Sequence, residues 1–196
     1  KLKNRQSAPA QMTIEQTKYI EASPDFKVEL LTPNEYSRPQ LAIDTVNGIV
    51  IHYTANPGTT AEQNRSYFES LAQTKETYAS SHFVIGIEGE IIQCIPCNEI
   101  AYASNDRNND TISIECCIPD DSGKFTDATY ESLTELTAWL MGRYDLTNEK
   151  FIRHYDVTGK NCPKYYVENP DAWTQFKEDL LTYIDTYGIE KKQEIN

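Results

Sequence analysis

Short apolar segments with strand periodicity alternate with longer segments of helical periodicity, and this alternation predicts a mixed α/β domain around one central β-sheet flanked by helices. Of the 196 residues, 39% are hydrophobic and 11% are aromatic, which favours a folded globular protein. This length suits one domain with a substantial core and a short appendage. No apolar run approaches the roughly 20 residues that a membrane-spanning helix needs, so no transmembrane segment is expected.

The first forty residues are polar and contain four prolines. We expect residues 1–40 to form an N-terminal arm, partly extended, that packs on the main domain. Thr13 and Gln16 form a capping pair that favours a short helix to Tyr19, and residues 26–30 alternate as a strand does. A disordered linker is the alternative for the first ten residues.

The first core strand is expected at residues 46–54, which contain the apolar run 48–51. A helix follows that begins after Thr59 or Thr60. Glu62 or Gln63, three positions later, would complete a capping box at this helix start.

A β-hairpin is expected next, with strands at 83–87 and 90–94. Glu88 and Gly89 between them predict a two-residue turn, with Gly89 at a positive φ. Residues 111–115 form the next predicted strand, which ends in a carboxylate.

Two amphipathic helices and a short strand complete the predicted domain. One helix opens at 126–127, and the strand at 151–154 follows it. The last helix has Asn169 as its cap and Pro170 in its first turn, and it stops at Gly188.

These elements divide the chain into the arm at 1–40, a main domain at 41–188 and a solvated tail at 189–196. Acidic residues outnumber basic ones by 30 to 18, and the formal net charge is −12. A nucleic-acid-binding protein normally carries a basic stripe. The sequence has none, so nucleic acid is excluded as a partner, and the acidic balance indicates a soluble surface.

Histidine and cysteine positions predict a metal site. His154 and Cys162 are separated by eight positions, with Gly159 and Pro163 forcing a turn. His52 ends the apolar run of the first core strand. Imidazole and thiolate ligands suit zinc at about 2.0–2.3 Å, and three protein ligands leave the fourth position open to water, as in catalytic zinc sites.

Four ordered segments carry a family resemblance: residues 49–54, 82–86, 112–115 and 154–163. Through them, residues 45 to 187 resemble zinc-dependent N-acetylmuramoyl-L-alanine amidases of the type-2 amidase family. That family shares its fold with phage lysozyme-type amidases and peptidoglycan recognition proteins. The resemblance implies a zinc ion at His52, His154 and Cys162, and hydrolysis of the amide bond between N-acetylmuramic acid and L-alanine in peptidoglycan.

Amide hydrolysis also needs a base and a group that stabilises the oxyanion. Glu115 ends a strand predicted to be buried, where a carboxylate is costly, and Lys160 lies two residues before Cys162. We expect Glu115 to be the base and proton shuttle and Lys160 to hold the oxyanion, and the resemblance implies the same pair. A salt-bridged Glu115 and an ordinary surface Lys160 are the alternatives. Some members place a Tyr where this chain has Ser81, so Glu115 would carry the proton transfer alone.

Weaker candidates for substrate contacts are Thr54, His82 and Arg107. Arg107 lies in a polar loop that lines the cleft in the family, where it could hold a stem-peptide carboxylate. The alternative is a solvent-facing arginine. His82 is either a pocket wall or donor to a metal ligand, or a structural core histidine. Thr54 follows His52 by two positions.

The four remaining cysteines are expected to be buried thiols: Cys94, Cys97, Cys116 and Cys117. One disulfide between segments 94–97 and 116–117 is the alternative for an exported protein.

Two other functions stay open. A recognition module would bind muropeptide without cleaving it, but non-catalytic relatives usually lose a zinc ligand. A structural zinc protein would need a fourth protein ligand, for which Cys117 and His82 are the candidates.

Peptidoglycan or a muropeptide is the expected partner of a monomeric protein. Since this substrate lies outside the cytoplasm, an extracellular or cell-wall location is expected. A phage- or prophage-encoded protein that acts at lysis is the alternative. The start at Lys1, without Met, is typical of a removed leader or a trimmed chain.

Overall fold

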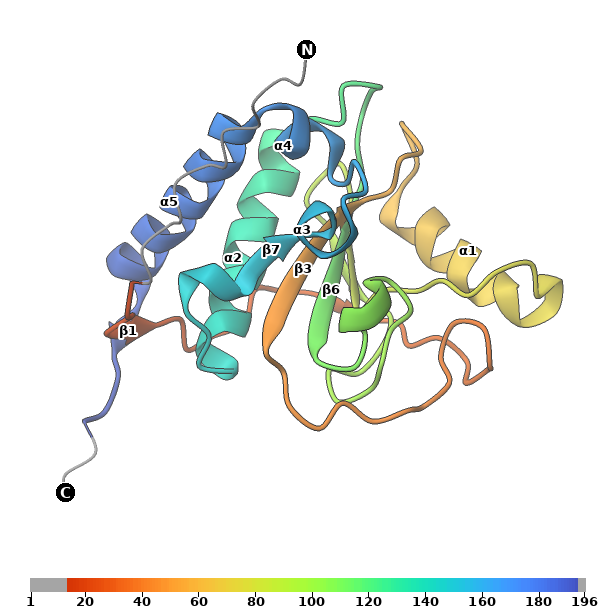
Figure 1. Cartoon of the computed structure of the whole chain (residues 1–196), viewed down its shortest axis with the longest axis horizontal. Coiled ribbons are helices and arrows are strands. Elements are labelled where there is room, and N and C mark those ends of the chain that lie inside the picture. Colours follow the sequence, from red (N-terminus) through yellow and green to blue (C-terminus); the bar gives the residue numbers. More distant parts are fainter. Residues whose placement is uncertain (1–13, 194–196) are drawn as a thin grey trace, which may run out of the picture.

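The computed structural model describes residues 14–193, which form a six-stranded mixed sheet with helices on both faces (Figure 1). The strand order is β2-β5-β4-β6-β3-β7. Strands β3, β6 and β7 run parallel, β4 is parallel to β6, β2 is parallel to β5, and within this sheet only the β4–β5 pair is antiparallel. The strands are β2 (Lys27–Val28), β3 (Gly48–Tyr53), β4 (Phe83–Ile85), β5 (Ile91–Gln93), β6 (Thr111–Cys116) and β7 (Phe151–Arg153). The mixed α/β prediction is confirmed.

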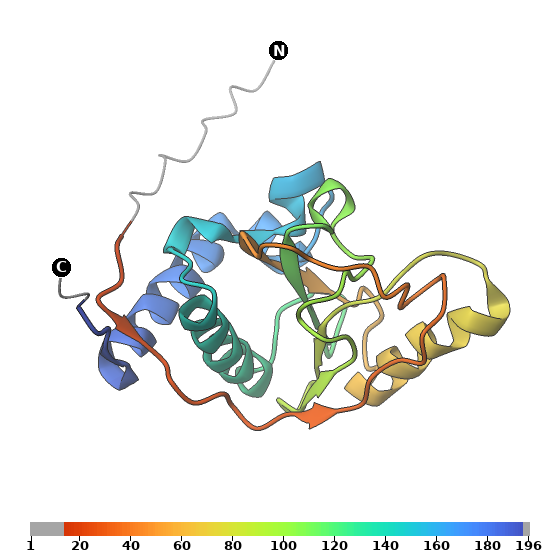
Figure 2. The ribbon, with the colours of Figure 1, turned by 90° about the horizontal axis from the view of Figure 1, so that it is seen from below.

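Helices α2 and α5 pack together over one face of the sheet, and α1 covers the other face (Figures 1 and 2). The α-helices are α1 (Ala61–Thr74), α2 (Asp127–Arg143), α3 (His154–Thr158), α4 (Lys164–Glu168) and α5 (Pro170–Tyr187). The short 3-10 helices are η1 (Asn105–Arg107) and η2 (Asn148–Lys150). None of the helices within residues 14–193 is long and apolar enough to cross a bilayer.

Strand alternation separates two hydrophobic cores. Ile112 and Ile114 of β6 belong to the larger core under α2 and α5, whereas Val84 of β4 belongs to the smaller core beside α1. Val84 is paired with Glu115 in the β4–β6 ladder. Since paired residues share a face, Glu115 lies on the α1 side of the sheet.

Helix α1 begins with the capping box that the sequence predicts. The Gln63 amide N–H donates to Thr60 Oγ1 at 3.1 Å, and the Thr60 amide N–H donates to Gln63 Oε1 at 2.9 Å. Of the alternatives at this helix start, the structure selects Thr60 with Gln63. The two bonds satisfy amides that the helix itself leaves without partners.

The hairpin turn is longer than predicted. The Gly86 amide N–H donates to the Glu90 carbonyl oxygen at 2.8 Å, and the Gly89 amide N–H donates to the Gly86 carbonyl oxygen at 3.0 Å. Three residues, 87–89, therefore lie between the hydrogen-bonded pair Gly86 and Glu90 that closes the hairpin, and Gly89 adopts a φ of 85°. Any Cβ at Gly89 would also lie 2.8 Å from the Ala128 carbonyl oxygen.

The helix predicted near Tyr19 is wrong for its described part, and Thr13 lies outside the described residues. Strand β1 (Lys18–Tyr19) instead pairs antiparallel with β8 (Ile189–Glu190). An extended backbone is favoured here because β8 satisfies its hydrogen bonds and Gly142 of α2 lets the Tyr19 side chain approach closely. The tail expected from residue 189 thus begins as a strand.

The arm runs from β1 past α2 to β2 and then beside α1 (Figure 2). Its Phe26 ring contacts the rings of Phe83 and Trp139, with centroids 5.6 and 6.0 Å apart. Leu31 is fully buried in the smaller core. Burying a side chain of this size stabilises the fold by about 1.5–3 kcal/mol.

Candidate metal centre and active site

The carboxyl ends of three parallel strands carry the candidate site. His52 is the fifth residue of β3, Glu115 is the fifth of β6, and His154 directly follows β7 as the first residue of α3. Polar groups at the carboxyl ends of parallel strands converge at one edge of the sheet, where open α/β sheets bind ligands. Cys162 arrives on the loop after α3, and its carbonyl oxygen accepts a hydrogen bond from the Tyr155 amide at 2.9 Å.

His52, His154 and Cys162 form a buried cluster whose ligand atoms all lie within 4.8 Å of one another. The two Nδ1 atoms are 3.1 Å apart, and Cys162 Sγ lies 4.0 Å from His52 Nδ1. Tetrahedral ligands at about 2.0–2.3 Å from a zinc ion would be roughly 3.3–3.8 Å apart. The observed separations therefore fit a metal ion held between them.

Hydrogen bonds at the Nε2 atoms set the orientation of both histidine rings. His154 Nε2 lies 2.8 Å from Asn105 Oδ1, and His52 Nε2 lies 3.0 Å from Ser104 Oγ. Because an amide oxygen only accepts, Nε2 of His154 carries the proton and Nδ1 presents its lone pair. With Ser104 Oγ as acceptor, His52 has the same tautomer. Two lone pairs at 3.1 Å repel each other unless a cation lies between them, which is a second reason to expect a metal.

The sequence does not predict the roles of Ser104 and Asn105, although both lie in the polar loop 104–109 that also carries the candidate Arg107. Asn108 holds the loop in place, because its Oδ1 accepts from the Ser104 amide at 2.6 Å and from the Ala103 amide at 3.2 Å. Nothing in the sequence links this loop to a histidine about fifty positions away.

Burial tunes the ionisation of the cluster. It lowers the pKa of His52 well below the ordinary value, and the charges of His154 and Lys160 lower it further. Burial and Lys160 also lower the pKa of His154. Both rings are therefore neutral near pH 7, which is the form that binds a metal. Burial raises the pKa of Cys162 to about 12, so its thiolate forms only with a compensating cation.

Glu115 is opposite His52 in the β3–β6 ladder. Burial raises the pKa of its carboxyl to about 8, and only Lys160 opposes the shift. A carboxyl group with such a pKa can accept and return a proton near neutral pH. Among the ion pairs within residues 14–193, none includes Glu115.

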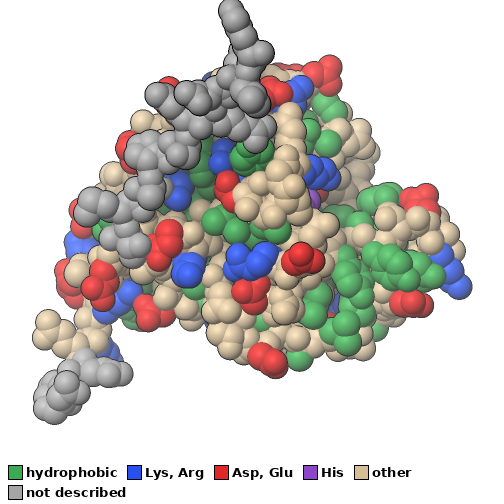
Figure 3. All heavy atoms as spheres, in the orientation of Figure 1, with side chains coloured by type: hydrophobic (Ala, Val, Ile, Leu, Met, Phe, Trp, Pro, Cys, Tyr) green, Lys and Arg blue, Asp and Glu red, His purple; other side chains and the backbone are tan. Residues whose placement is uncertain are grey.

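A cavity of about 230 Å³ opens onto the cluster. Glu115 and the exposed Lys160 line it together with the three cluster residues, and Tyr78, Ser80 and Tyr102 contribute to its wall. Figure 3 shows a small patch of histidine surface beside a basic side chain, with hydrophobic side chains gathered towards the α1 end of the molecule. The groups that would activate a nucleophile, transfer a proton and stabilise an oxyanion can therefore all reach one bound molecule.

His82 lies away from this lining, in the core. Its Nδ1 accepts a hydrogen bond from the Ser113 amide at 3.0 Å, and its Nε2 donates to the Glu99 carbonyl oxygen at 2.7 Å. Burial lowers its pKa to about 4. These are the contacts of a structural core histidine, which was one of the two roles left open.

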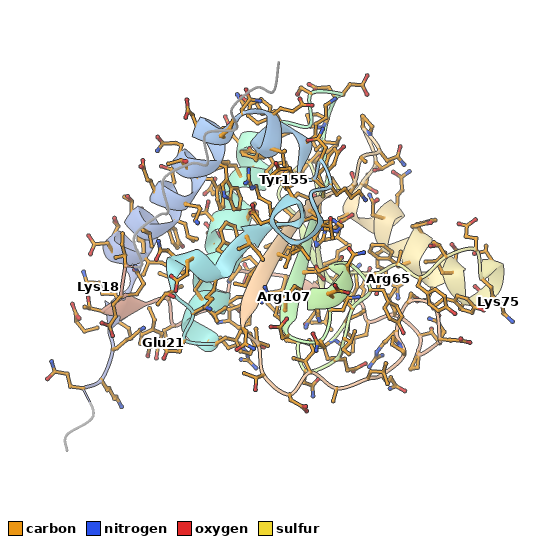
Figure 4. The ribbon with its side chains drawn as sticks, viewed as in Figure 1. Lys18, Glu21, Arg65, Lys75, Arg107 and Tyr155 are labelled. Atoms are coloured by element: carbon orange, nitrogen blue, oxygen red, sulfur yellow. The ribbon has the colours of Figure 1, made fainter. Side chains whose placement is uncertain are left out.

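Arg107 and Thr54 are also absent from the cavity lining. Arg107 makes a bidentate ion pair with Asp110, at 2.8 and 3.1 Å, near Gly48 at the start of β3 (Figure 4). His52 lies four positions after Gly48 along this strand, a span of about 13 Å. Thr54 donates its amide hydrogen to the Cys116 carbonyl oxygen at 3.0 Å.

All five cysteines are free thiols. The disulfide considered between segments 94–97 and 116–117 does not form. Cys94 and Cys117 lie in the smaller core and Cys116 lies in the larger one, so the sheet separates the two adjacent thiols. Among residues 14–193, only His52, His154 and Cys162 form a potential metal-binding group, and neither Cys117 nor His82 joins them.

Comparison with known proteins gives consistent matches. Residues 43–165 match the family model Amidase_2, described as N-acetylmuramoyl-L-alanine amidase. The N-acetylmuramoyl-L-alanine amidase CwlL of Bacillus licheniformis is 34% identical over an alignment of 171 residues that covers 81% of this chain and 47% of the relative. The amidase BlyA of Bacillus subtilis (strain 168) is 34% identical over an alignment of 187 residues that covers 85% of this chain and 49% of the relative.

The chain thus spans about half the length of the curated relatives it matches. Among solved structures, the catalytic domain of XlyA superimposes with a TM-score of 0.67 at 25% identity. That match covers 80% of this chain and 99% of the XlyA domain. The described fold therefore corresponds to a whole catalytic domain of that protein.

Proposed function

Since the chain belongs to the Amidase_2 family of N-acetylmuramoyl-L-alanine amidases, we propose that it hydrolyses the amide bond between N-acetylmuramic acid and L-alanine in peptidoglycan, with a zinc ion as cofactor. The observation that carries this proposal is the three-residue cluster of His52, His154 and Cys162, which shares one cavity with Glu115 and Lys160. Three protein ligands leave one coordination position for water or substrate, as catalytic zinc requires.

His52, His154 and Cys162 would hold the zinc ion, through Nδ1 of each ring and Sγ of the thiolate. Ser104 and Asn105 keep the two rings in the ligating tautomer. When bound, zinc supplies positive charge that polarises a carbonyl group and lowers the pKa of water towards about 7.

Glu115 acts as the base in this mechanism. Its carboxylate takes a proton from the water that attacks the lactyl amide carbonyl and then returns the proton to the nitrogen of the departing L-alanine. One group can do both because burial raises the pKa of this carboxyl, which makes the carboxylate a stronger base, and the acid it forms can then return the proton. The Lys160 ammonium stabilises the negative charge that develops on the carbonyl oxygen.

A recognition module that binds peptidoglycan without cutting it is the second candidate. The presence of Glu115 and Lys160 in the same cavity as the cluster favours the enzyme, because binding alone requires neither group there. We propose that the protein is a monomer that acts at the cell wall and is encoded by a bacterium or by a phage.

The test is mass spectrometry of a defined muropeptide after incubation with the zinc-loaded protein. We expect release of a stem peptide that begins with L-alanine, lost in Glu115→Ala and after chelation. Glu131→Ala, a change on the exposed surface of α2, is the matched control and should retain activity. Intact muropeptide together with calorimetric binding would instead support the recognition module.

A further inference from the structure

Three tyrosines from distant segments of the chain gather near the cluster of His52, His154 and Cys162. Tyr36 comes from the arm, Tyr78 follows α1, and Tyr102 precedes η1. The rings of Tyr36 and Tyr78 stack with centroids 4.9 Å apart and planes at 21°, and Tyr102 meets Tyr78 edge to face at 5.6 Å. Tyr78 and Tyr102 line the same cavity as His52 and Glu115.

Backbone hydrogen bonds hold these segments together. The Ala79 amide N–H donates to the Tyr36 carbonyl oxygen at 3.2 Å, and the Ser80 amide N–H donates to the Tyr102 carbonyl oxygen at 3.0 Å. The Tyr102 amide N–H in turn donates to Ser80 Oγ at 3.0 Å. The three rings are therefore positioned before any ligand arrives, which lowers the entropic cost of binding.

The arm segment that carries Tyr36 is anchored by an ion pair. Arg38 contacts the Glu99 carboxylate at 3.0 Å through both Nε and Nη2, and the side chains are only 12% and 15% exposed. Arg38 also donates to the Leu31 carbonyl oxygen at 2.9 Å. This segment lies outside residues 43–165, the part matched by the family model.

Tyr78 remains 53% exposed although Tyr36 stacks on it. An exposed aromatic ring in the wall of a cavity offers a flat apolar face to a ligand. Its hydroxyl donates to Glu35 Oε1 at 3.2 Å, so the edge of the platform carries negative charge.

The charged side chains around the three tyrosines determine which kind of ligand can bind there. The nearby arginine, Arg38, is already paired with Glu99, and the cavity cation Lys160 comes from the loop that carries Cys162. A stem peptide carries carboxylates, which Glu35 would repel. A pyranose ring is neutral at this face, and its C–H groups carry partial positive charge that suits the negative face of an aromatic ring.

We propose that Tyr36, Tyr78 and Tyr102 form a platform that binds a sugar ring of the peptidoglycan glycan strand, with Tyr78 as the main contact. This assignment rests on the proposed function, and it places the glycan on one side of the scissile bond against the platform.

Binding of a peptide-free tetrasaccharide of alternating N-acetylglucosamine and N-acetylmuramic acid, with its lactyl carboxyl groups capped as methyl amides so that the glycan is neutral, tests the platform directly. Calorimetry with the full chain should give an affinity that falls about tenfold in Tyr78→Ala and is largely retained in Tyr78→Phe, because stacking needs the ring and not the hydroxyl. Tyr36→Ala should also weaken binding, through loss of the supporting ring. The control is Tyr187→Ala, on a ring that is 69% exposed on α5. Thermal unfolding of each variant establishes that it is folded.

Kinetics on a glycan-linked muropeptide supply the second readout. Tyr78→Ala should raise KM about tenfold with little change in kcat, because the ring takes no part in proton transfer. No binding of the tetrasaccharide by the wild type, or equal affinity in Tyr78→Ala, would overturn the platform even if the amide is cleaved. Glycan binding that depends on Tyr78, without any cleavage, would instead refute the proposed hydrolysis and leave the platform standing.

Discussion

His52 and Glu115 face each other in the parallel ladder between β3 and β6. Strand register alone therefore sets the distance between a candidate metal ligand and the candidate base. A shift of one residue would send one of the two side chains to the opposite face of the sheet. The buried isoleucines that alternate with them in both strands prevent such a shift, since they would have to leave the larger core.

Loss of Cys162 should abolish stoichiometric zinc binding. We expect the zinc content to fall from about one ion per chain in the wild type to less than about a tenth in Cys162→Ser, because a serine hydroxyl is a poor substitute for a thiolate. Elemental analysis after dialysis measures the metal content. Cys97→Ser, a change at a partly buried thiol outside the cluster, should keep its zinc. Equal zinc content in the two variants would contradict the ligand assignment.

Asn105 should tune metal affinity without contacting the metal. Asn105→Gly removes the acceptor for His154 Nε2, and glycine suits the positive φ of 53° at this position. Loss of such a partner typically costs 10–100-fold in metal affinity. Competition with a chromophoric chelator gives the affinity. Ser70→Ala, at a half-buried position of α1 outside the cluster, is the control, and an unchanged affinity in Asn105→Gly would contradict the orienting role.

Glu115 should make the metal-free protein less stable as pH rises. Its folded-state pKa of about 8 exceeds the ordinary value of 4.5. Between these values the folded state binds more protons than the unfolded state, so the free energy of unfolding falls with increasing pH. The contribution is fully present below about pH 4.5 and is lost, by up to roughly 5 kcal/mol, as pH passes about 8.

Urea unfolding of wild type and Glu115→Gln at about pH 5.5 and about pH 8.5 measures this effect. Glutamine does not titrate, so the advantage of Glu115→Gln over wild type should grow with pH. The comparison cancels the titration of His52 and His154, which both proteins share. An equal difference at both pH values would mean that the carboxyl has an ordinary pKa.

Lys160 should contribute to rate rather than to structure. Lys160→Met is expected to lower kcat about 10²–10³-fold, as the loss of an oxyanion donor does. Zinc content and Tm should not change, because the side chain is exposed. Lys164→Met is the matched control, since Lys164 Nζ donates to the Asp121 carbonyl oxygen and does not line the cavity. Comparable kcat values for both variants would exclude the oxyanion role.

Local chemistry made several elements predictable. Thr60 and Gln63 satisfy each other within one helical turn, and Ile112 and Ile114 alternate with polar residues along β6, so neither feature depends on distant contacts. The hairpin loop was misjudged because Gly89 could serve either a two-residue or a three-residue loop. Lys18 and Tyr19 were misjudged because their strand partner lies about 170 residues away.

The sequence by itself determined the α/β architecture and the candidate ligands His52, His154 and Cys162, because periodicity and donor chemistry are properties of the residues. Only the tertiary structure decided that Ser104 and Asn105 orient the histidine rings, that Arg107 pairs with Asp110, and that Tyr36 stacks on Tyr78. Some of these contacts join segments that are distant along the chain. The others depend on which of several possible partners lies close enough in the folded protein. A hydrogen bond or ring contact depends on a few ångströms of distance, and separation along the chain does not encode that distance.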